Sequence, residues 1–207
     1  MGASEILLKE RAALCDTFDK YGAEAPTLCE GWLTLDLAAH LVAREARSDA
    51  AIGLVIPAFA GHLQRVMDNY KTKGYDTLVG MLRTGPPWMH RTGPLATANV
   101  NENFVHHEDV RRASGEGPRA LEPEMSDILW KMLGIGVRKK RLHGVALTLR
   151  EPGGREKAVT KEGEPVVLAG EPGELALFMA GRKQSAVVTH DGHADAVAIV
   201  LGAEFGI

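Results

Sequence analysis

A carboxylate and an imidazole stand four residues apart in the segment 101–109, NENFVHHED, whose pattern predicts a helix. At 3.6 residues per turn, Glu102 and His106 project from the same helix face, one turn apart. This is one of the few spacings at which a single helix can present two ligands to one metal ion. A third nitrogen ligand from another helix would complete a His₂Glu set with an open coordination position, as in catalytic zinc sites. His40, in the predicted helix that begins near residue 34, is a candidate for this third ligand.

The surroundings of the pair on the helix indicate a partly buried polar pocket. On a helical wheel, His106 lies about 40° from Glu102, and Asp109 lies about 20° to the other side. Small apolar residues share this stripe: Ala98, Val105 and Ala113. A buried carboxylate and imidazole need partners, and a metal ion supplies one. The alternative is an ordinary pair of Glu102 and His106 on the helix surface. Asp109 either orients a metal ligand or forms a surface ion pair with Arg112.

The remaining polar residues near these positions have weaker patterns. His107 and Glu108 point away from the stripe, so we expect them at solvent or at an interface. His40 lies at the border of the apolar side of its helix, one turn before Arg44. By itself, such a histidine is more often a hydrogen-bonded residue of the core boundary than a metal ligand. The spacing therefore leaves the identity of the third ligand open.

Two other sets of residues could carry chemistry, but their patterns do not indicate it. His190 and His193 flank Asp191 and Gly192, which predict a turn, so we expect both histidines to be exposed. The chain has two cysteines and no CxxC pair, so a disulfide framework is not expected. Cys15 falls on an apolar stripe and is expected to be a small buried hydrophobic residue. Cys29 lies in a loop, where it is either reactive or packed.

The composition limits the classes of partner. The 207 residues suffice for one large or two small domains, with 45% apolar and 25% charged residues. A net charge of −3 argues against nucleic acid as the main partner, and the basic run 138–141 is expected to be a solvated helix end. No signal peptide pattern occurs, and no apolar run approaches the ~18 residues of a membrane span. We therefore predict a cytoplasmic protein that contacts no membrane.

Helical periodicity and turn residues predict an α+β chain, with a helical bundle over residues 1–142 and a small α+β domain over residues 143–207. Helices are predicted at 4–21, 34–53, 58–71, 74–82, 96–113, 122–141 and 172–180. Strands are predicted at 145–150, 157–161, 166–168 and 186–189, and the segment 194–201 fits either type.

Three segments together resemble a known family. Residues 28–41, LCEGWLTLDLAAHL, resemble the GW-T-x-x-DL-x-x-HL stretch of the DinB-like, mycothiol-dependent maleylpyruvate isomerase superfamily. The positions Glu102, His106 and Asp109 resemble its second metal motif, and residues 174–182, ELALFMAGR, resemble its carboxy-terminal helix. Within the superfamily, the chain is most similar to a short actinobacterial branch of metal-binding proteins marked by APTLCEGW and FVHHEDVRR. The resemblance extends over nearly the whole chain.

The resemblance implies a four-helix-type amino-terminal bundle that holds a divalent metal ion, usually zinc, through His40, Glu102 and His106. It also implies a sterol-carrier-like carboxy-terminal domain. Arg182 matches a position suited to holding a substrate carboxylate, although an arginine there could equally cap helix carbonyls. Trp32 is expected to pack its loop against the bundle, or alternatively to form a wall of the active site.

The implied chemistry is that of a metal-activated thiol. A zinc ion with an open position lowers the pKa of a bound thiol, here mycothiol as cosubstrate, which would attack a small-molecule electrophile. In the isomerase, the thiolate adds to the double bond of maleylpyruvate. Rotation about the resulting carbon–carbon single bond and elimination of the thiolate then yield fumarylpyruvate. The expected activity is thus a thiol-dependent isomerase or S-transferase. The alternatives are a non-catalytic protein that binds a thiol or a small ligand, and an interaction protein without metal. The sequence does not determine the oligomeric state, with a monomer as one option.

Overall fold

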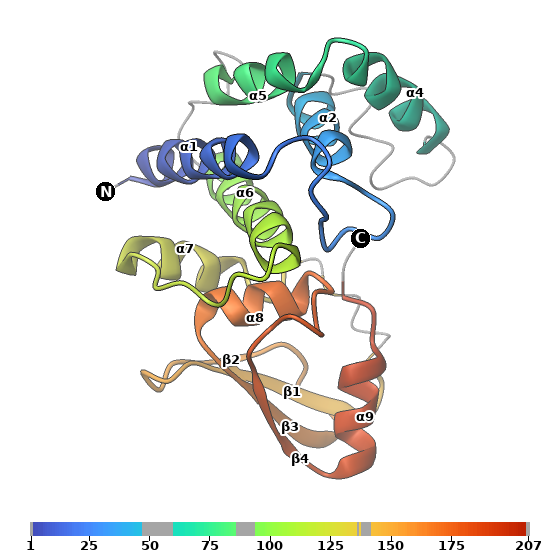
Figure 1. Cartoon of the computed structure of the whole chain (residues 1–207). Coiled ribbons are helices and arrows are strands. Elements are labelled where there is room, and N and C mark those ends of the chain that lie inside the picture. Colours follow the sequence, from blue (N-terminus) through green and yellow to red (C-terminus); the bar gives the residue numbers. More distant parts are fainter. Residues whose placement is uncertain (1, 47–59, 86–93, 136, 138–141, 206–207) are drawn as a thin grey trace. The chain divides into compact units, whose positions relative to one another are not determined.

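The computed structural model of the chain describes residues 2–46, 60–85, 94–135, 137 and 142–205 (Figure 1). The chain divides into two compact units, Met1–Gly117 and Pro118–Ile207. The sequence predicted a division after residue 142. In the structure, helix α7 (Pro123–Met132) packs against helix α8 (Pro172–Met179) and so belongs with the second unit.

The first unit consists of helices in its described residues. They are α1 (Ala3–Tyr21), α2 (Thr34–Ala46), α4 (Ala60–Lys71), α5 (Tyr75–Thr84) and α6 (Pro94–Ala113). Helix α1 packs against α5 and α6, and α2 packs against α4 and α5. Fully buried Phe18, Leu37 and Leu78 bring α1, α2 and α5 into one hydrophobic core. The unit is thus the helical bundle that the sequence pattern predicted.

Helix α1 ends where the sequence predicted. Gly22 takes a positive φ of 78°, a conformation that strongly favours glycine, and its N–H donates to the Phe18 carbonyl. The chain then turns into the loop that leads to α2. The hydroxyl of Thr34, the first residue of α2, donates back to the Gly22 carbonyl. The end of α1 and the start of α2 are therefore fastened together, which holds the intervening loop.

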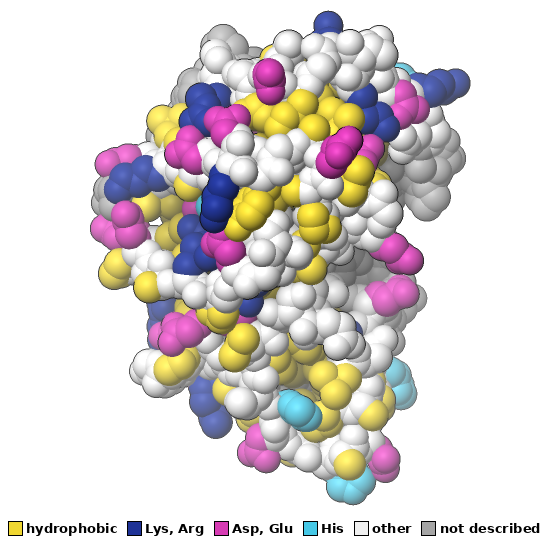
Figure 2. All heavy atoms as spheres, viewed as in Figure 1, with side chains coloured by type: hydrophobic (Ala, Val, Ile, Leu, Met, Phe, Trp, Pro, Cys, Tyr) yellow, Lys and Arg dark blue, Asp and Glu magenta, His cyan; other side chains and the backbone are white. Residues whose placement is uncertain are grey.

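Ion pairs between helices hold the outer face of the bundle. Glu116, just after α6, accepts hydrogen bonds from Lys20 and Tyr21 of α1 and from Arg111 of α6. On the face shown in Figure 2, basic and acidic side chains lie next to one another and do not form a patch of one sign. This alternation agrees with the low net charge of the chain.

The second unit contains a four-stranded mixed sheet with the order β2-β1-β3-β4. Its strands are β1 (Val145–Arg150), β2 (Glu156–Ala158), β3 (Glu164–Ala169) and β4 (Thr189–Gly192). Strands β1 and β3 are parallel, and the two outer strands pair antiparallel to them. Helix α9 (Ala194–Gly202) packs against β1, β3 and β4. The segment that fitted either type is therefore a helix, and the α+β prediction is confirmed.

Two predicted elements of this unit are corrected. The helix predicted to reach residue 141 ends at Met132, because the following residues form a turn in which Gly134 has a φ of +80°. The strand predicted at 186–189 is replaced by β4, so Asp191 and Gly192 lie in a strand and not in a turn. The backbone N–H of Val187 donates to the Glu174 carboxylate of α8, and the ladder with β3 begins only afterwards.

Some predicted features lie outside the described residues: the part of the second helix beyond residue 46, the segment with His90, and the basic run 138–141. In the described part of the chain, no helix has the length and apolar character needed to cross a bilayer.

Candidate metal site

The structure brings together the three side chains that the resemblance names as ligands. His40 of α2 and Glu102 and His106 of α6 place one ligand atom each within 4.8 Å of one another. The Nε2 atom of His106 lies 3.3 Å from Oε1 of Glu102, and the rings of His40 and His106 have centroids 5.4 Å apart. Two imidazoles and one carboxylate at this separation fit a divalent transition metal, because these are the donors of three-ligand zinc sites.

A second group of potential ligands overlaps the first and shares His106. Its other members are Cys29 and Asp109, with ligand atoms again within 4.8 Å. The Nδ1 atom of His106 lies 2.9 Å from Oδ2 of Asp109, and the Cys29 thiol donates to the same oxygen at 3.2 Å. Because a carboxylate only accepts hydrogen bonds, the Nδ1–H of His106 points at Asp109. Nε2 then faces Glu102, so the geometry favours the group with His40 for the metal and Asp109 for orienting His106.

Asp109 is one of the most buried residues of the chain, with 0% of its side chain exposed. The alternative of a surface ion pair for this residue is therefore wrong. Glu102 keeps 29% of its side chain exposed and contacts His106, whose side chain is only 10% exposed. The pair is therefore partly buried and is not the ordinary surface pair that the spacing alone allowed. The cluster as a whole runs from the buried Asp109 to the solvent-facing Glu102.

The loop between α1 and α2 closes over this cluster. The backbone N–H of Leu28 donates to the Asp109 carbonyl, which fastens the loop to α6. Inside the loop, the hydroxyl of Thr27 accepts from the Cys29 N–H and donates to the Trp32 carbonyl. The Trp32 ring stacks at a tilt on His40, with centroids 5.0 Å apart. The loop thus places one side chain against each of the two histidines.

Neighbouring charges and hydrogen bonds favour the ionised carboxylate of Glu102 and the protonated ring of His106. Burial alone would raise the pKa of Glu102, but its contact with His106 and the charge of Arg44 lower that pKa to about 2. Burial would lower the pKa of His106, yet hydrogen bonds with Asp109, Cys29 and Glu102 raise it well above its usual value. Without metal, these interactions favour the protonated ring of His106 beside the ionised Glu102, and a divalent cation would supply positive charge in place of that proton.

Two neighbours of the cluster are not where the sequence pattern put them. His107 and Glu108 were expected at solvent or at an interface, but their exposed fractions are 4% and 0%. The His107 ring forms two hydrogen bonds with residues of α1. Its Nδ1 atom lies 2.7 Å from Oε1 of Glu10, and its Nε2 atom lies 2.8 Å from the Thr17 hydroxyl. Glu108 accepts from Arg111 and Arg112 of its own helix. The wheel of α6 could not show this burial, because the packing of α1 against α6 covers that side.

The other candidate residues have simpler environments. Cys15 is fully buried, as expected, and burial raises its pKa to about 11. His190 lies in β4 and His193 follows that strand directly, and both are exposed, as expected. In the second unit, Arg182 donates from Nη1 to the Ala180 carbonyl at the end of α8, at 2.6 Å. This contact is the helix-capping arrangement that the sequence left as an alternative.

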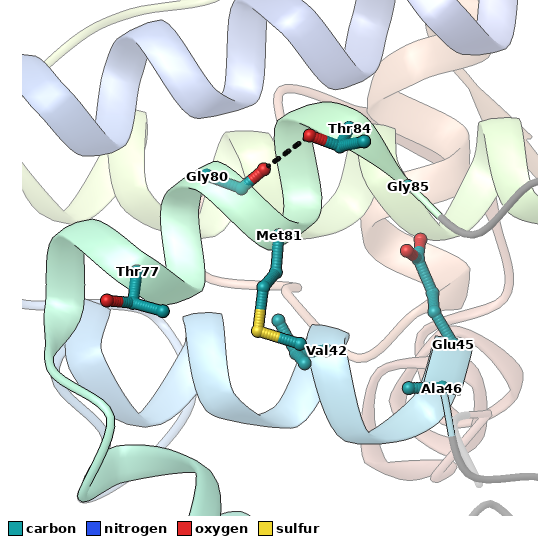
Figure 3. Close-up of a pocket in the computed structure, with 8 residues that line it drawn as sticks. All are labelled: Val42, Glu45, Ala46, Thr77, Gly80, Met81, Thr84 and Gly85. Atoms are coloured by element: carbon teal, nitrogen blue, oxygen red, sulfur yellow. Dashed lines mark hydrogen bonds between the residues drawn. The ribbon is translucent and has the colours of Figure 1, made fainter.

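A cavity of about 490 Å³ lies between α2 and α5, beside a buried pair of Arg11 and Glu45 (Figure 3). Its lining residues are Val42, Glu45, Ala46, Thr77, Gly80, Met81, Thr84 and Gly85. None of these residues belongs to the metal cluster. At 100° per residue, the lining positions of α2 lie on the side of the helix opposite to His40.

Comparison with known proteins identifies a solved structure with a similar fold. No protein-family model matches the sequence, and no curated protein matches it either. A search of solved structures matches the crystal structure of the mycothiol-dependent maleylpyruvate isomerase, with a TM-score of 0.58. The match covers 91% of each chain at 17% sequence identity. The chain has the fold of this isomerase. The expected resemblance is thus confirmed for the fold, and at this identity the likeness speaks for the fold alone.

Proposed function

We propose that this chain binds one zinc ion through His40, Glu102 and His106 and uses it to activate a low-molecular-weight thiol such as mycothiol. The reaction class would be a thiol-dependent isomerisation or S-transfer to a small electrophile. The single observation that carries the proposal is the convergence of two imidazoles and one carboxylate within 4.8 Å. The fold shared with a mycothiol-dependent isomerase supports the choice of a thiol as cosubstrate.

The donor set fits a catalytic ion better than a structural one. Structural zinc sites have four protein ligands, whereas catalytic sites have three and an open position. When bound, zinc would supply Lewis-acid chemistry that lowers the pKa of a thiol toward neutral pH. Asp109 would hold the Nδ1 proton of His106, and Trp32 would shield His40 from water.

A role for Arg182 in substrate binding remains a prediction. Its Nη1 donates to the Ala180 carbonyl, so a substrate carboxylate would have to share the guanidinium with this contact or replace it. Replacing Arg182 with glutamine should raise the KM for a carboxylate-bearing electrophile and leave zinc affinity unchanged. A KM equal to that of the wild type would assign this arginine to helix capping alone.

The proposed function is tested by turnover with and without metal. The zinc-loaded chain is incubated with mycothiol and either maleylpyruvate or a chlorinated electrophile, and the products are followed by mass spectrometry. We expect turnover that disappears on chelation and returns with zinc. The matched control is Cys15→Ala, which changes a buried thiol of the bundle core outside the cluster.

The negative results separate the competing functions. Binding of zinc and mycothiol without turnover of any electrophile would indicate a non-catalytic thiol-binding protein. Thiol binding that persists unchanged in metal-stripped protein would contradict the proposed mechanism, because the thiol would then not depend on the ion.

A further inference from the structure

Arg44 occupies the solvent-facing end of the metal cluster. It stands one turn after His40 on α2, so both side chains project from the same face of that helix. Its Nε atom lies 3.3 Å from Oε1 of Glu102, and its Nη1 donates to Oδ1 of Asn99 at 3.0 Å. Asn99 and Glu102 are three residues apart on α6 and therefore share a face. The guanidinium is thus held by two points on the helix that also carries His106.

The side chains of Arg44 and Glu102 are more exposed than those of Asp109 and His106. The exposed fraction of the side chain is 0% for Asp109, 10% for His106, 19% for Arg44 and 29% for Glu102. A small molecule that approaches from solvent would therefore meet the Arg44 and Glu102 end before it reaches the imidazoles.

The charge of Arg44 is only partly neutralised in this arrangement. Asn99 is neutral, so it orients the guanidinium without cancelling its charge. Glu102 carries the opposite charge, but a metal ion bound to this carboxylate would compete with Arg44 for the same negative charge. Within the described part of the chain, Nε of Arg44 faces Glu102 and Nη1 donates to Asn99. A guanidinium in this state is suited to a carboxylate, whose two oxygens match its planar donors.

We propose that Arg44 is the anion-recognition residue of this site, where it would bind a carboxylate of the electrophile, an inference that rests on the proposed metal-dependent function. Arg44 would hold the carboxylate near the ion at the exposed end of the cluster. It would therefore set substrate specificity from within the first unit, whatever the role of Arg182.

The test measures binding of maleate, a small dicarboxylate, to the zinc-loaded full chain by titration calorimetry without any thiol. Arg44→Gln should weaken maleate binding by about tenfold or more, because it removes the charge and the fork of donors. Arg44→Lys should give an intermediate affinity, because it keeps the charge but not the planar fork. The uncharged diamide of maleate should bind the wild type and the Arg44→Gln variant within about twofold of one another.

The controls separate anion recognition from metal retention. All titrations are made at full zinc occupancy, confirmed by elemental analysis, and thermal melting confirms folding of each variant. Arg83→Gln is the matched control, because Arg83 is an exposed arginine on α5 that pairs with Asp16 and Asp19 outside the cluster. It should bind maleate like the wild type.

Three results would overturn the role of Arg44: no maleate binding by the wild type, maleate affinity unchanged in Arg44→Gln, or an equal loss in Arg83→Gln. Zinc uptake and thiol turnover decide the proposed function separately. A chain that binds zinc and mycothiol normally but fails the maleate test would refute this inference alone.

Discussion

At the scale of the residue, the site depends on one imidazole with two differently used nitrogens. The Nδ1 atom of His106 faces Asp109, and Nε2 faces Glu102. The same Asp109 oxygen also accepts from Cys29, so three residues from two segments determine how the ring is oriented. The pattern Glu102-x-x-x-His106 predicted the pair. The contact with Cys29 joins positions 80 residues apart, which no local spacing can reveal.

Replacing Asp109 with asparagine should lower zinc affinity by about tenfold to a hundredfold, the usual cost of removing a carboxylate behind a metal-bound histidine. The substitution keeps the size of the side chain but removes the charge that holds the Nδ1 proton. Competition with a chromophoric chelator at pH 7 measures the effect. Asp76→Asn, an exposed position on α5, is the control. Equal zinc affinity in Asp109→Asn and the wild type would show that Asp109 does not support the ligand.

At the scale of the element, ion pairs and glycines fix how neighbouring segments meet. Glu116 joins α1 to the end of α6, and its pKa is lowered to about 2, first by its hydrogen bonds to Lys20 and Tyr21. In the second unit, Gly163 has a φ of +111° and lies directly against Gly144, where β1 begins. Neither role is visible in sequence, since each depends on a partner distant in the chain.

Replacing Glu116 with glutamine should lower the free energy of unfolding at pH 7 by about 1 kcal/mol, the scale of a partly exposed ionic network. The folded-state pKa lies below the usual value of 4.5, so this stabilisation is complete above about pH 4.5 and is lost as the pH falls toward 2. Urea unfolding at pH 7 and pH 3 should show a smaller difference between variant and wild type at pH 3. A difference that grows on acidification would contradict the assignment.

Replacing Gly163 with alanine should destabilise the second unit by about 2 kcal/mol or more, because a φ of this sign disfavours a side chain and the new methyl group meets backbone. A Cβ at this position would stand 2.1 Å from the Gly144 carbonyl carbon. Gly202→Ala is the control, because a Cβ there would meet no atom within 4 Å apart from those of neighbouring residues and of its own helix backbone. Thermal unfolding of both variants measures the difference, and equal melting temperatures would contradict the clash.

At the scale of the whole molecule, the helical pattern and the change of texture near residue 143 predicted the α+β class, and the structure confirms it. Periodicity predicted the bounds of α1 and α6 to within two residues. It failed for His107 and Glu108, because a wheel describes one helix and cannot show that α1 packs against α6. It also misplaced β4, because a strand of four exposed residues has no apolar alternation to reveal it.

The central claim is the three-ligand metal site, and elemental analysis of the purified chain tests it most directly. We expect about one zinc ion per chain in the wild type, and less than about a tenth of that after His40→Ala or His106→Ala, because losing one of three ligands removes tight binding. Cys29→Ala should keep the ion, since the thiol lies beside the ligand set and not within it. Full zinc occupancy in both histidine variants, or a wild-type chain that cannot be loaded with zinc, would contradict the account.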